Sequence, residues 1–371
     1  MRFRFSPHNG SKTKEFDIFE YKEDNDMQEF KIGPNEEGQR LDKFLHKYLK
    51  EAGTSFLYKM LRKKNITLNK KKADGKEMLH SGDVVQFFFS DETFLKFRGN
   101  IAVNSVENKT NNAGKKATDV AFLQYQKAYE KFKNIDIVFE NQHILLLNKP
   151  AGILSQKSQP SDLSVNEWLI GYLLYTGQIT KEQMETYKPS ICNRLDRNTS
   201  GLMICGKSFL GSRQMNSLIK ERKIRKFYRT FVKGEVKDSS YIKGYLMKDE
   251  KNNKVTLKET VNESEYEQYV PIETAYSPIA WKNGYTYLEV ELITGKTHQI
   301  RAHLSSKGHP LLGDEKYGDR KWNSRFEEYK IPKWQLLHSY RLEFPEMDGE
   351  FADISKCSFV AKEPEIYEKL R

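Results

Sequence analysis

Strand-like segments spread along the chain constrain its fold more than any other feature. In the segments 226–236 and 285–293 apolar and polar residues alternate, as in half-buried strands, and helical segments such as residues 208–223 lie between the strands. Because most of these strands are not neighbours in sequence, we expect an α+β fold, with a mixed, mostly antiparallel sheet and flanking helices. The clearest segments are IDIVFE (135–140), HILLLNKPAG (143–152), KFYRTFVKGEV (226–236) and YTYLEVELI (285–293).

Composition divides the 371 residues into parts. Residues 99–118 are rich in Asn, Lys, Gly and Thr, which is typical of linkers, and the segment VAFLQYQKAYEKF that follows predicts a short helix. We expect an N-terminal extension (1–30), a small α+β domain (31–98), a linker (99–132) and a large α+β domain (133–371).

The small domain has a clear helical pattern. Leu41, Phe44, Leu45 and Tyr48 follow the i, i+3, i+4, i+7 spacing of an amphipathic helix, which Gly53 would end. Thr54 or Ser55 would cap a second helix, and the segments ITLN and VVQFFF predict short strands.

Charge and cysteine usage restrict the partners and the compartment. The chain has 62 Lys and Arg against 51 Asp and Glu, a net charge of +11, which favours a polyanion such as RNA as partner. Three cysteines without a CxxC pair favour neither a disulfide framework nor a zinc site. Neither an apolar run of about 18–20 residues nor a signal-peptide core is present, so we expect a cytoplasmic protein without a membrane partner.

One basic cluster surrounds the second predicted helix of the small domain. Such clusters are ordinarily solvated surface, but a cluster of one sign can also grip a phosphate backbone without reading bases. The arrangement RLDKFL…TSFLYKMLRKKNITLNKKK…SGDVV resembles the S-four-like RNA-binding domain, with Asn65, which tolerates a left-handed conformation, where glycine is common. The expected RNA-binding residues are Arg62, Lys63, Lys64, Lys70, Lys71 and Lys72.

Three segments of the large domain contain residues suited to chemistry, and each also has a purely structural interpretation. In NRLDRNTSGL (193–202), Asp196 is either a turn residue or a reactive carboxylate. In residues 293–314, a helix near Thr297 places His298, Arg301 and Ser305 on one face. Tyr228 lies on a basic strand, where packing is the commoner role of tyrosine.

Taken together, these segments resemble the RluA-type pseudouridine synthases, which isomerise uridines in RNA. NRLDRNTSGL is similar to the HRLDxxTSGL signature of that family, and ITGKTHQIRAHLSSKGHPLLGDEKYG to its GRTHQIRxH…GxPxxGDxxYG signature. HILLLNKPAGILSQ, KFYRTFVKG and LLHSYRLEF also match family segments, so the resemblance extends over about residues 135–350. It implies the pseudouridine-synthase fold.

The resemblance also implies a mechanism. The family breaks the bond between ribose and nitrogen 1 of uracil, turns the base and rejoins it through carbon 5, without a cofactor or a metal. Asp196 matches its indispensable aspartate, Arg301 the charge partner, and Tyr228 the tyrosine that stacks on uracil and can take the proton from carbon 5. Whether the carboxylate attacks the sugar, attacks the base or acts through a glycal stays open.

Further residues are expected to bind the substrate. Arg194 matches the position that enters the space left by the flipped nucleotide, and Lys220 and Arg225 would attract the RNA backbone. Ile300 and Leu337 would form an apolar wall of the pocket, or equally pack in the core. Asn193 stands where the family has histidine, so that position cannot titrate and we expect its role to be structural.

We therefore expect a monomeric RNA pseudouridine synthase that acts on large-subunit ribosomal RNA. Transfer RNA is an alternative substrate, and a non-catalytic RNA-binding or ribosome-assembly protein is an alternative function. A glycoside hydrolase would need a second carboxylate about 5–9.5 Å from the first. Only Asp314 or Glu315 of the second signature could supply it.

Overall fold

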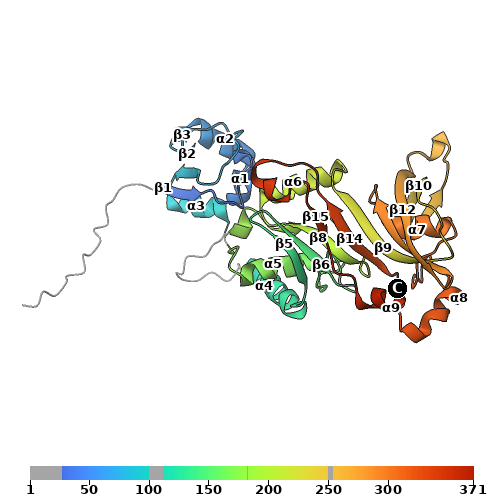
Figure 1. Ribbon diagram of the computed structural model, residues 1–371. Coiled ribbons are helices and arrows are strands. Elements are labelled where there is room, and N and C mark those ends of the chain that lie inside the picture. The colour runs from blue at the N-terminus through green and yellow to red at the C-terminus, as the bar shows by residue number, and fades with distance from the viewer. Residues whose placement is uncertain (1–26, 100–111, 182, 250–253) are drawn as a thin grey trace, which may run out of the picture.

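The computed structural model describes residues 27–99, 112–181, 183–249 and 254–371. Two sheets dominate these residues: a four-stranded sheet formed before residue 89 and an eleven-stranded sheet formed after residue 135. The smaller sheet and its helices lie at one end of the larger one (Figure 1).

The small sheet has the strand order β1-β4-β2-β3 and packs against helices through its own aromatic core. The predicted helical pattern is observed, because Leu41, Phe44 and Leu45 are completely buried on one face of α1. The elements are β1 (Met27–Lys31), α1 (Leu41–Tyr48), α2 (Thr54–Arg62), β2 (Ile66–Leu68), β3 (Lys71–Lys72), β4 (Val84–Phe88) and α3 (Asp91–Arg98).

Three expectations for this region need correction. The sheet begins at Met27, because β1 pairs with β4, so the extension predicted for residues 1–30 is too long; its first 26 residues lie outside the described residues. Gly53, rather than Thr54 or Ser55, precedes the first residue of α2 and caps it without a side chain. Lys64, rather than Asn65, takes the left-handed conformation after α2, with φ at 62°.

The large sheet has the order β11-β10-β12-β13-β9-β14-β8-β6-β5, with β15 on β14 and β7 on β8. Its described pairs are antiparallel except β14 with β8, so the expected mixed, mostly antiparallel α+β fold is confirmed. The strands are β5 (Asp136–Glu140), β6 (Ile144–Lys149), β7 (Ser190–Ile191), β8 (Ser200–Gly206), β9 (Arg225–Lys233), β10 (Ser240–Asp249), β11 (Lys254–Lys258), β12 (Val270–Lys282), β13 (Tyr285–Leu292), β14 (Leu337–Glu343) and β15 (Ser358–Val360).

Helices flank this sheet, and one of them, α4, corrects part of the predicted linker (Figure 1). Helix α4 packs on α5, and Tyr125 and Ala128 of α4 belong to the main core. The contact is close: a Cβ atom at Gly171 of α5 would lie 2.3 Å from the carbonyl oxygen of Tyr125. The segment 99–132 is therefore not all linker, and its residues 100–111 lie outside the described residues. The helices are α4 (Asn112–Lys131), α5 (Val165–Tyr175), α6 (Phe209–Lys220), α7 (Gln299–Ser306), α8 (Arg320–Asn323) and α9 (Glu365–Leu370).

Polar contacts join the small sheet region to the large one. Thr186 donates to Oε1 of Glu36 at 2.6 Å, and Arg98 lies 2.7 Å from Oε2 of Glu185. Burial raises the pKa of Glu36, and the hydrogen bond from Thr186 opposes that shift. Arg213 of α6 also donates to the carbonyl oxygen of Gly38 at 2.9 Å, so the two regions are packed together.

None of the helices in the described parts of the chain combines the length and the apolar character that crossing a membrane requires.

Candidate active site

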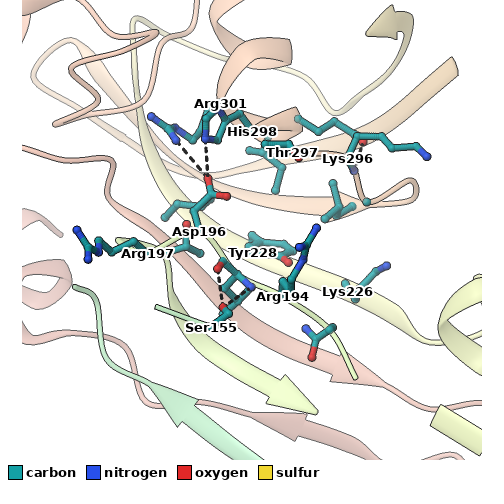
Figure 2. Close-up of a pocket in the computed structure, with 18 of the residues that line it drawn as sticks. Ser155, Arg194, Asp196, Arg197, Lys226, Tyr228, Lys296, Thr297, His298 and Arg301 are labelled. Atoms are coloured by element: carbon teal, nitrogen blue, oxygen red, sulfur yellow. Dashed lines mark hydrogen bonds and ion pairs between the residues drawn. The ribbon is translucent and has the colours of Figure 1, made fainter. Parts of the chain in front are cut away.

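A cavity of about 890 Å³ opens where the segment before β8, the strand β9 and the start of α7 meet (Figure 2). Three of the segments singled out in the sequence therefore contribute to one site, although the chain separates them widely. The lining side chains include Asp196 and Arg194 from the first segment, Tyr228 from β9, and Arg301 from α7. Within the lining of this cavity, Asp196 is the one carboxylate.

The turn that presents Asp196 is held by buried polar groups. The Ser155 hydroxyl donates to the carbonyl oxygen of Leu195 at 2.6 Å and accepts from its N–H at 3.0 Å. Lys149, which is completely buried, donates from Nζ to the carbonyl oxygens of Pro150, Ile153 and Arg197 at 2.9–3.0 Å. Burial lowers the pKa of Lys149 to about 7, and the charge of Asp196 opposes the shift.

Asn193 has a structural contact at the same turn. Its Oδ1 accepts a hydrogen bond of 2.7 Å from the N–H of Ile204 on β8. An amide oxygen suffices for this contact, which agrees with the expectation that no titrating group is needed at this position.

Arg301 links two carboxylates. Its Nη1 lies 3.2 Å from Oδ2 of Asp196, while Nε and Nη2 form a two-pronged pair with Asp314 at 2.7 and 3.0 Å. Burial by itself lowers the pKa of Arg301, but Asp314 and Asp196 raise it above the ordinary value. Such a pair fixes the guanidinium plane, so Asp314 orients the cation that faces Asp196.

This pairing also removes Asp314 as the second acid of a glycoside hydrolase, and Glu315, the other candidate, is exposed and does not line the cavity. Asp314 is completely buried and accepts two hydrogen bonds from Arg301. Burial raises the pKa of Asp314, but Arg301 and two backbone N–H groups outweigh it and lower the pKa below its ordinary value. An ionised, fully paired carboxylate cannot supply the proton that a second acid must donate.

Tyr228 is buried in the wall of the cavity, with 5% of its surface exposed. It lies on β9 directly opposite Ser339 of β14. Burial raises the pKa of Tyr228 to about 12, and the charge of Asp196 adds to this. The phenol is therefore neutral at physiological pH. Ile300 and Leu337 line the same cavity and also belong to the main core, so both interpretations of these two residues apply.

Cationic side chains dominate the rest of the lining. The predicted Arg194 and Lys220 are among them, and both are exposed. Alternation along β9 identifies another, since Lys226 lies two residues from Tyr228 and therefore on the same face of the sheet. The further cations of the lining are Lys157, Arg197, Arg222, Lys248, Lys296 and Lys316.

Arg225 was expected to bind substrate, but it does not line the cavity. Its guanidinium bonds Glu291 at 2.8 and 3.0 Å and Glu343 at 2.9 Å. Because side chains alternate along a strand, Arg225 lies on the face of β9 opposite that of Tyr228, away from the cavity. The prediction rested on other basic residues nearby in sequence, which does not show on which face of β9 a side chain lies.

His298 is the main polar group of the site for which no role was expected. It precedes α7 with φ at 53°, and its Nε2 lies 3.8 Å from Oδ2 of Asp196. Tyr317, whose phenol oxygen lies 3.0 Å from Nδ1 of His298, was not expected in the site either. Both residues belong to the second family signature, which was the sequence signal for them.

The six predicted basic residues of the small sheet region are all exposed at the end of α2 and around β3. Within the described residues, no carboxylate forms an ion pair with any of them. They leave an uncompensated positive surface, and their binding to RNA stays a prediction. They are Arg62, Lys63, Lys64, Lys70, Lys71 and Lys72.

The comparisons with known proteins agree with this chemistry. Residues 143–306 match the family model described as RNA pseudouridylate synthase. The chain is 29% identical over 323 residues to an RNA pseudouridine synthase of Mycoplasma genitalium, covering 86% of this chain and 90% of that protein. It is 28% identical over 313 residues to the ribosomal large subunit pseudouridine synthase C of Vibrio cholerae, covering 83% and 85%.

The fold is also similar to that of a solved structure, human RNA pseudouridylate synthase domain containing 4. The TM-score is 0.51 at 18% identity, and the match covers 67% of this chain and 95% of the human one.

Proposed function

Because the chain belongs to the RNA pseudouridylate synthase family, we propose that it converts specific uridines of large-subunit ribosomal RNA into pseudouridine, with Asp196 as the catalytic carboxylate. Ribosomal RNA is the substrate named for the Vibrio relative, and the strongly positive lining of the cavity suits a polyanion. We further propose that the protein works in the cytoplasm as a monomer.

One observation carries the assignment of Asp196. Its Oδ2 is held by Arg301, whereas Oδ1 accepts no hydrogen bond from any residue that the structure describes. One oxygen is thus fixed by a cation and the other is available to a nucleotide in the cavity (Figure 2). A carboxylate placed in this way can act beside the bond between C1′ of ribose and N1 of uracil while that bond breaks.

Tyr228 supports the second half of the reaction. After the base has turned, C5 bonds to C1′ and the proton on C5 must pass to a base, for which Asp196, the one carboxylate in the lining of the cavity, is available. A neutral phenol is a weak base, so the raised pKa of Tyr228 favours stacking of its ring on uracil over a standing phenolate. We assign Tyr228 to the face of the base, with its hydroxyl group as a hydrogen-bonding group near C5.

The cationic rim would bind the RNA around the flipped uridine. A uridine within a stack must leave it before Asp196 can reach the ribose. Arg194 is exposed at the mouth of the cavity, where its planar guanidinium can occupy the vacated space. Lys220 and Lys226 lie at the same rim and suit phosphates on either side of that uridine.

The experiment that tests this function is a map of pseudouridines in ribosomal and transfer RNA from cells with and without the gene. We expect one or a few large-subunit sites to be lost and to return with the wild-type gene but not with Asp196→Asn. Asp238→Asn, at an exposed aspartate outside the cavity, is the matched control and should restore them. Loss confined to transfer RNA would contradict the proposed substrate, and an unchanged map would contradict the function.

A further inference from the structure

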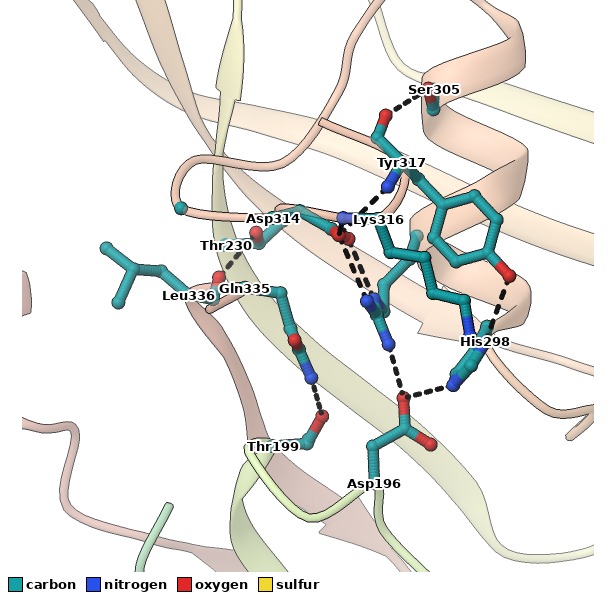
Figure 3. Close-up of polar contacts among 12 residues, drawn as sticks. Asp196, Thr199, Thr230, His298, Ser305, Asp314, Lys316, Tyr317, Gln335 and Leu336 are labelled. Carbon is teal, nitrogen blue, oxygen red and sulfur yellow. Dashed lines mark hydrogen bonds and ion pairs between the residues drawn. The ribbon is translucent and has the colours of Figure 1, made fainter. Parts of the chain in front are cut away.

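A chain of polar contacts runs from the edge strand β11 to Asp196, and Figure 3 shows its part from Tyr317 through His298 to Asp196. The N–H of Val255 on β11 donates to the phenol oxygen of Tyr317 at 2.9 Å. That oxygen lies 3.0 Å from Nδ1 of His298, and Nε2 of His298 lies 3.8 Å from Oδ2 of Asp196.

The first contact favours one direction for the others. Because the N–H of Val255 already donates to the phenol oxygen, the phenol hydrogen is best placed to donate to Nδ1 of His298. Nδ1 then accepts, and a neutral imidazole with an accepting Nδ1 carries its proton on Nε2. Burial lowers the pKa of His298 to about 4, so the ring is neutral near pH 7. Its Nε2–H therefore faces Asp196.

The side chains of Tyr317 and His298 are both held rigidly. The backbone N–H of Tyr317 donates to Oδ1 of Asp314 at 3.0 Å, and its carbonyl oxygen accepts from Ser305 at 2.6 Å. Asp314 also bonds Arg301, so one buried carboxylate anchors both Arg301, which reaches Oδ2 of Asp196, and Tyr317, which contacts His298 (Figure 3). His298 itself has a left-handed backbone and a side chain that is only 9% exposed.

We propose that His298 is a positioning residue for Asp196: its Nε2–H, set by Tyr317, joins Arg301 at Oδ2 and leaves Oδ1 directed at the nucleotide. This inference rests on the proposed function of the site. The separation of 3.8 Å is longer than a hydrogen bond, and such contacts commonly tighten when substrate binds. Two donors on one oxygen would stop the carboxylate from rotating about its last bond.

His303 shows what a purely structural histidine looks like on the same helix. It is 2% exposed, and its Nδ1 lies 3.0 Å from the hydroxyl of Thr274 on β12. It does not line the cavity. His298 differs because its second nitrogen points into the cavity at the catalytic oxygen (Figure 2).

The test uses the purified full chain, with single-turnover rates and RNA affinity measured separately on an RNA that the wild type modifies. His298→Met removes the donor, and we expect the rate to fall on the order of tenfold to a hundredfold while the RNA dissociation constant stays within about twofold. His298→Gln places an amide N–H near the position of Nε2, so it should recover most of the rate. Tyr317→Phe keeps the ring but no longer sets the tautomer of His298. Its single-turnover rate should lie between those of wild type and His298→Met.

A wild-type rate for His298→Met would overturn the proposal. So would a His298→Gln rate as low as that of His298→Met, when both melt like the wild type. If His298→Met melts early, Tyr317→Phe decides, since an unchanged rate in that variant would equally overturn it. A wild type that modifies none of the cellular RNAs would instead overturn the proposed function itself.

Discussion

Arg301 lies 3.2 Å from Asp196, although 105 residues separate them in the chain. The two arginines that flank Asp196 in sequence lie elsewhere and are not its ion-pair partners in the described residues. Arg194 is exposed at the mouth of the cavity, and the carbonyl oxygen of Arg197 accepts a hydrogen bond from Lys149. The partner of Asp196 is therefore set by the fold, which packs α7 against β11 and β12 and brings its Arg301 to Asp196, and not by sequence neighbours.

Arg301→Lys should abolish most activity, because an ammonium group cannot bond Asp314 with two prongs and reach Asp196 as well. We expect the rate to fall at least about 100-fold and the free energy of unfolding by about 3 kcal/mol, since Asp314 is left buried and poorly paired. Arg225→Lys, on the opposite face of the sheet, is the control and should keep its rate. Activity of Arg301→Lys near that of the control would contradict the charge pairing.

Lys149→Met should damage both the fold and the site. Three carbonyl oxygens, including that of Arg197 next to Asp196, lose their donor. Unpaired buried acceptors cost roughly 1–3 kcal/mol each, and water entering the site would offset part of this. We expect urea unfolding to show a loss of about 2–4 kcal/mol, whereas the exposed Lys333→Met should show less than about 0.5 kcal/mol. Equal stability of the two variants would refute the role of Lys149.

Acid should destabilise the protein through its buried histidines. Burial lowers the pKa of His338 to about 4, and a hydrogen bond to Ala361 opposes the shift. In the unfolded chain the pKa of histidine is about 6.5, so between these values only the unfolded state binds the proton. The free energy of unfolding therefore falls as the pH drops from about 6.5 toward 4, by about 2 kcal/mol at pH 5 for this group.

His338→Gln should flatten that part of the pH dependence in urea titrations at pH 7 and pH 5. The same substitution at His80, whose side chain is 74% exposed, should leave it unchanged. Identical slopes for wild type and His338→Gln would show that His338 is not the buried neutral group described above.

The basic surface of the small sheet region should make RNA binding sensitive to salt. Replacing Lys70, Lys71 and Lys72 with Gln removes up to three phosphate contacts, and each lost contact lowers the slope of log K against log salt by about 0.7–0.9. As the control, the same change at the exposed Lys321, Lys330 and Lys333, which do not line the cavity, should leave the slope unaltered. An unchanged slope in the first variant would remove this surface from the RNA interface.

Periodicity predicted the elements whose local pattern matches their burial. The spacing in α1 follows directly from which face is covered, whereas β9 and β13, whose sequences alternate, are largely buried on both faces. The strand β1 was missed because its burial depends on pairing with β4, which no local pattern records. The short helix predicted for the segment VAFLQYQKAYEKF is the larger part of α4 (Asn112–Lys131), whereas the start of α4 has the Asn- and Lys-rich composition of a linker and was assigned to it.

Part of the site could not be predicted from the sequence either. The resemblance brought Asp196, Arg301 and Tyr228 together, and Ile300 and Leu337 are indeed beside them. Arg225 was assigned to the cavity because a cluster of basic residues in the sequence does not show on which face of a strand each side chain lies. The contact between His298 and Tyr317 joins the start of α7 to the loop that follows it, and only the folded backbone determines it.

The most direct test of the central claim compares wild type with Asp196→Asn on one RNA that the wild type modifies. The amide keeps the size of the carboxylate and removes its charge. We expect the variant to bind that RNA within about twofold of wild type, yet to form no pseudouridine in a single turnover. Pseudouridine formation by Asp196→Asn at a rate comparable to that of wild type would contradict the assignment of Asp196 as the catalytic carboxylate.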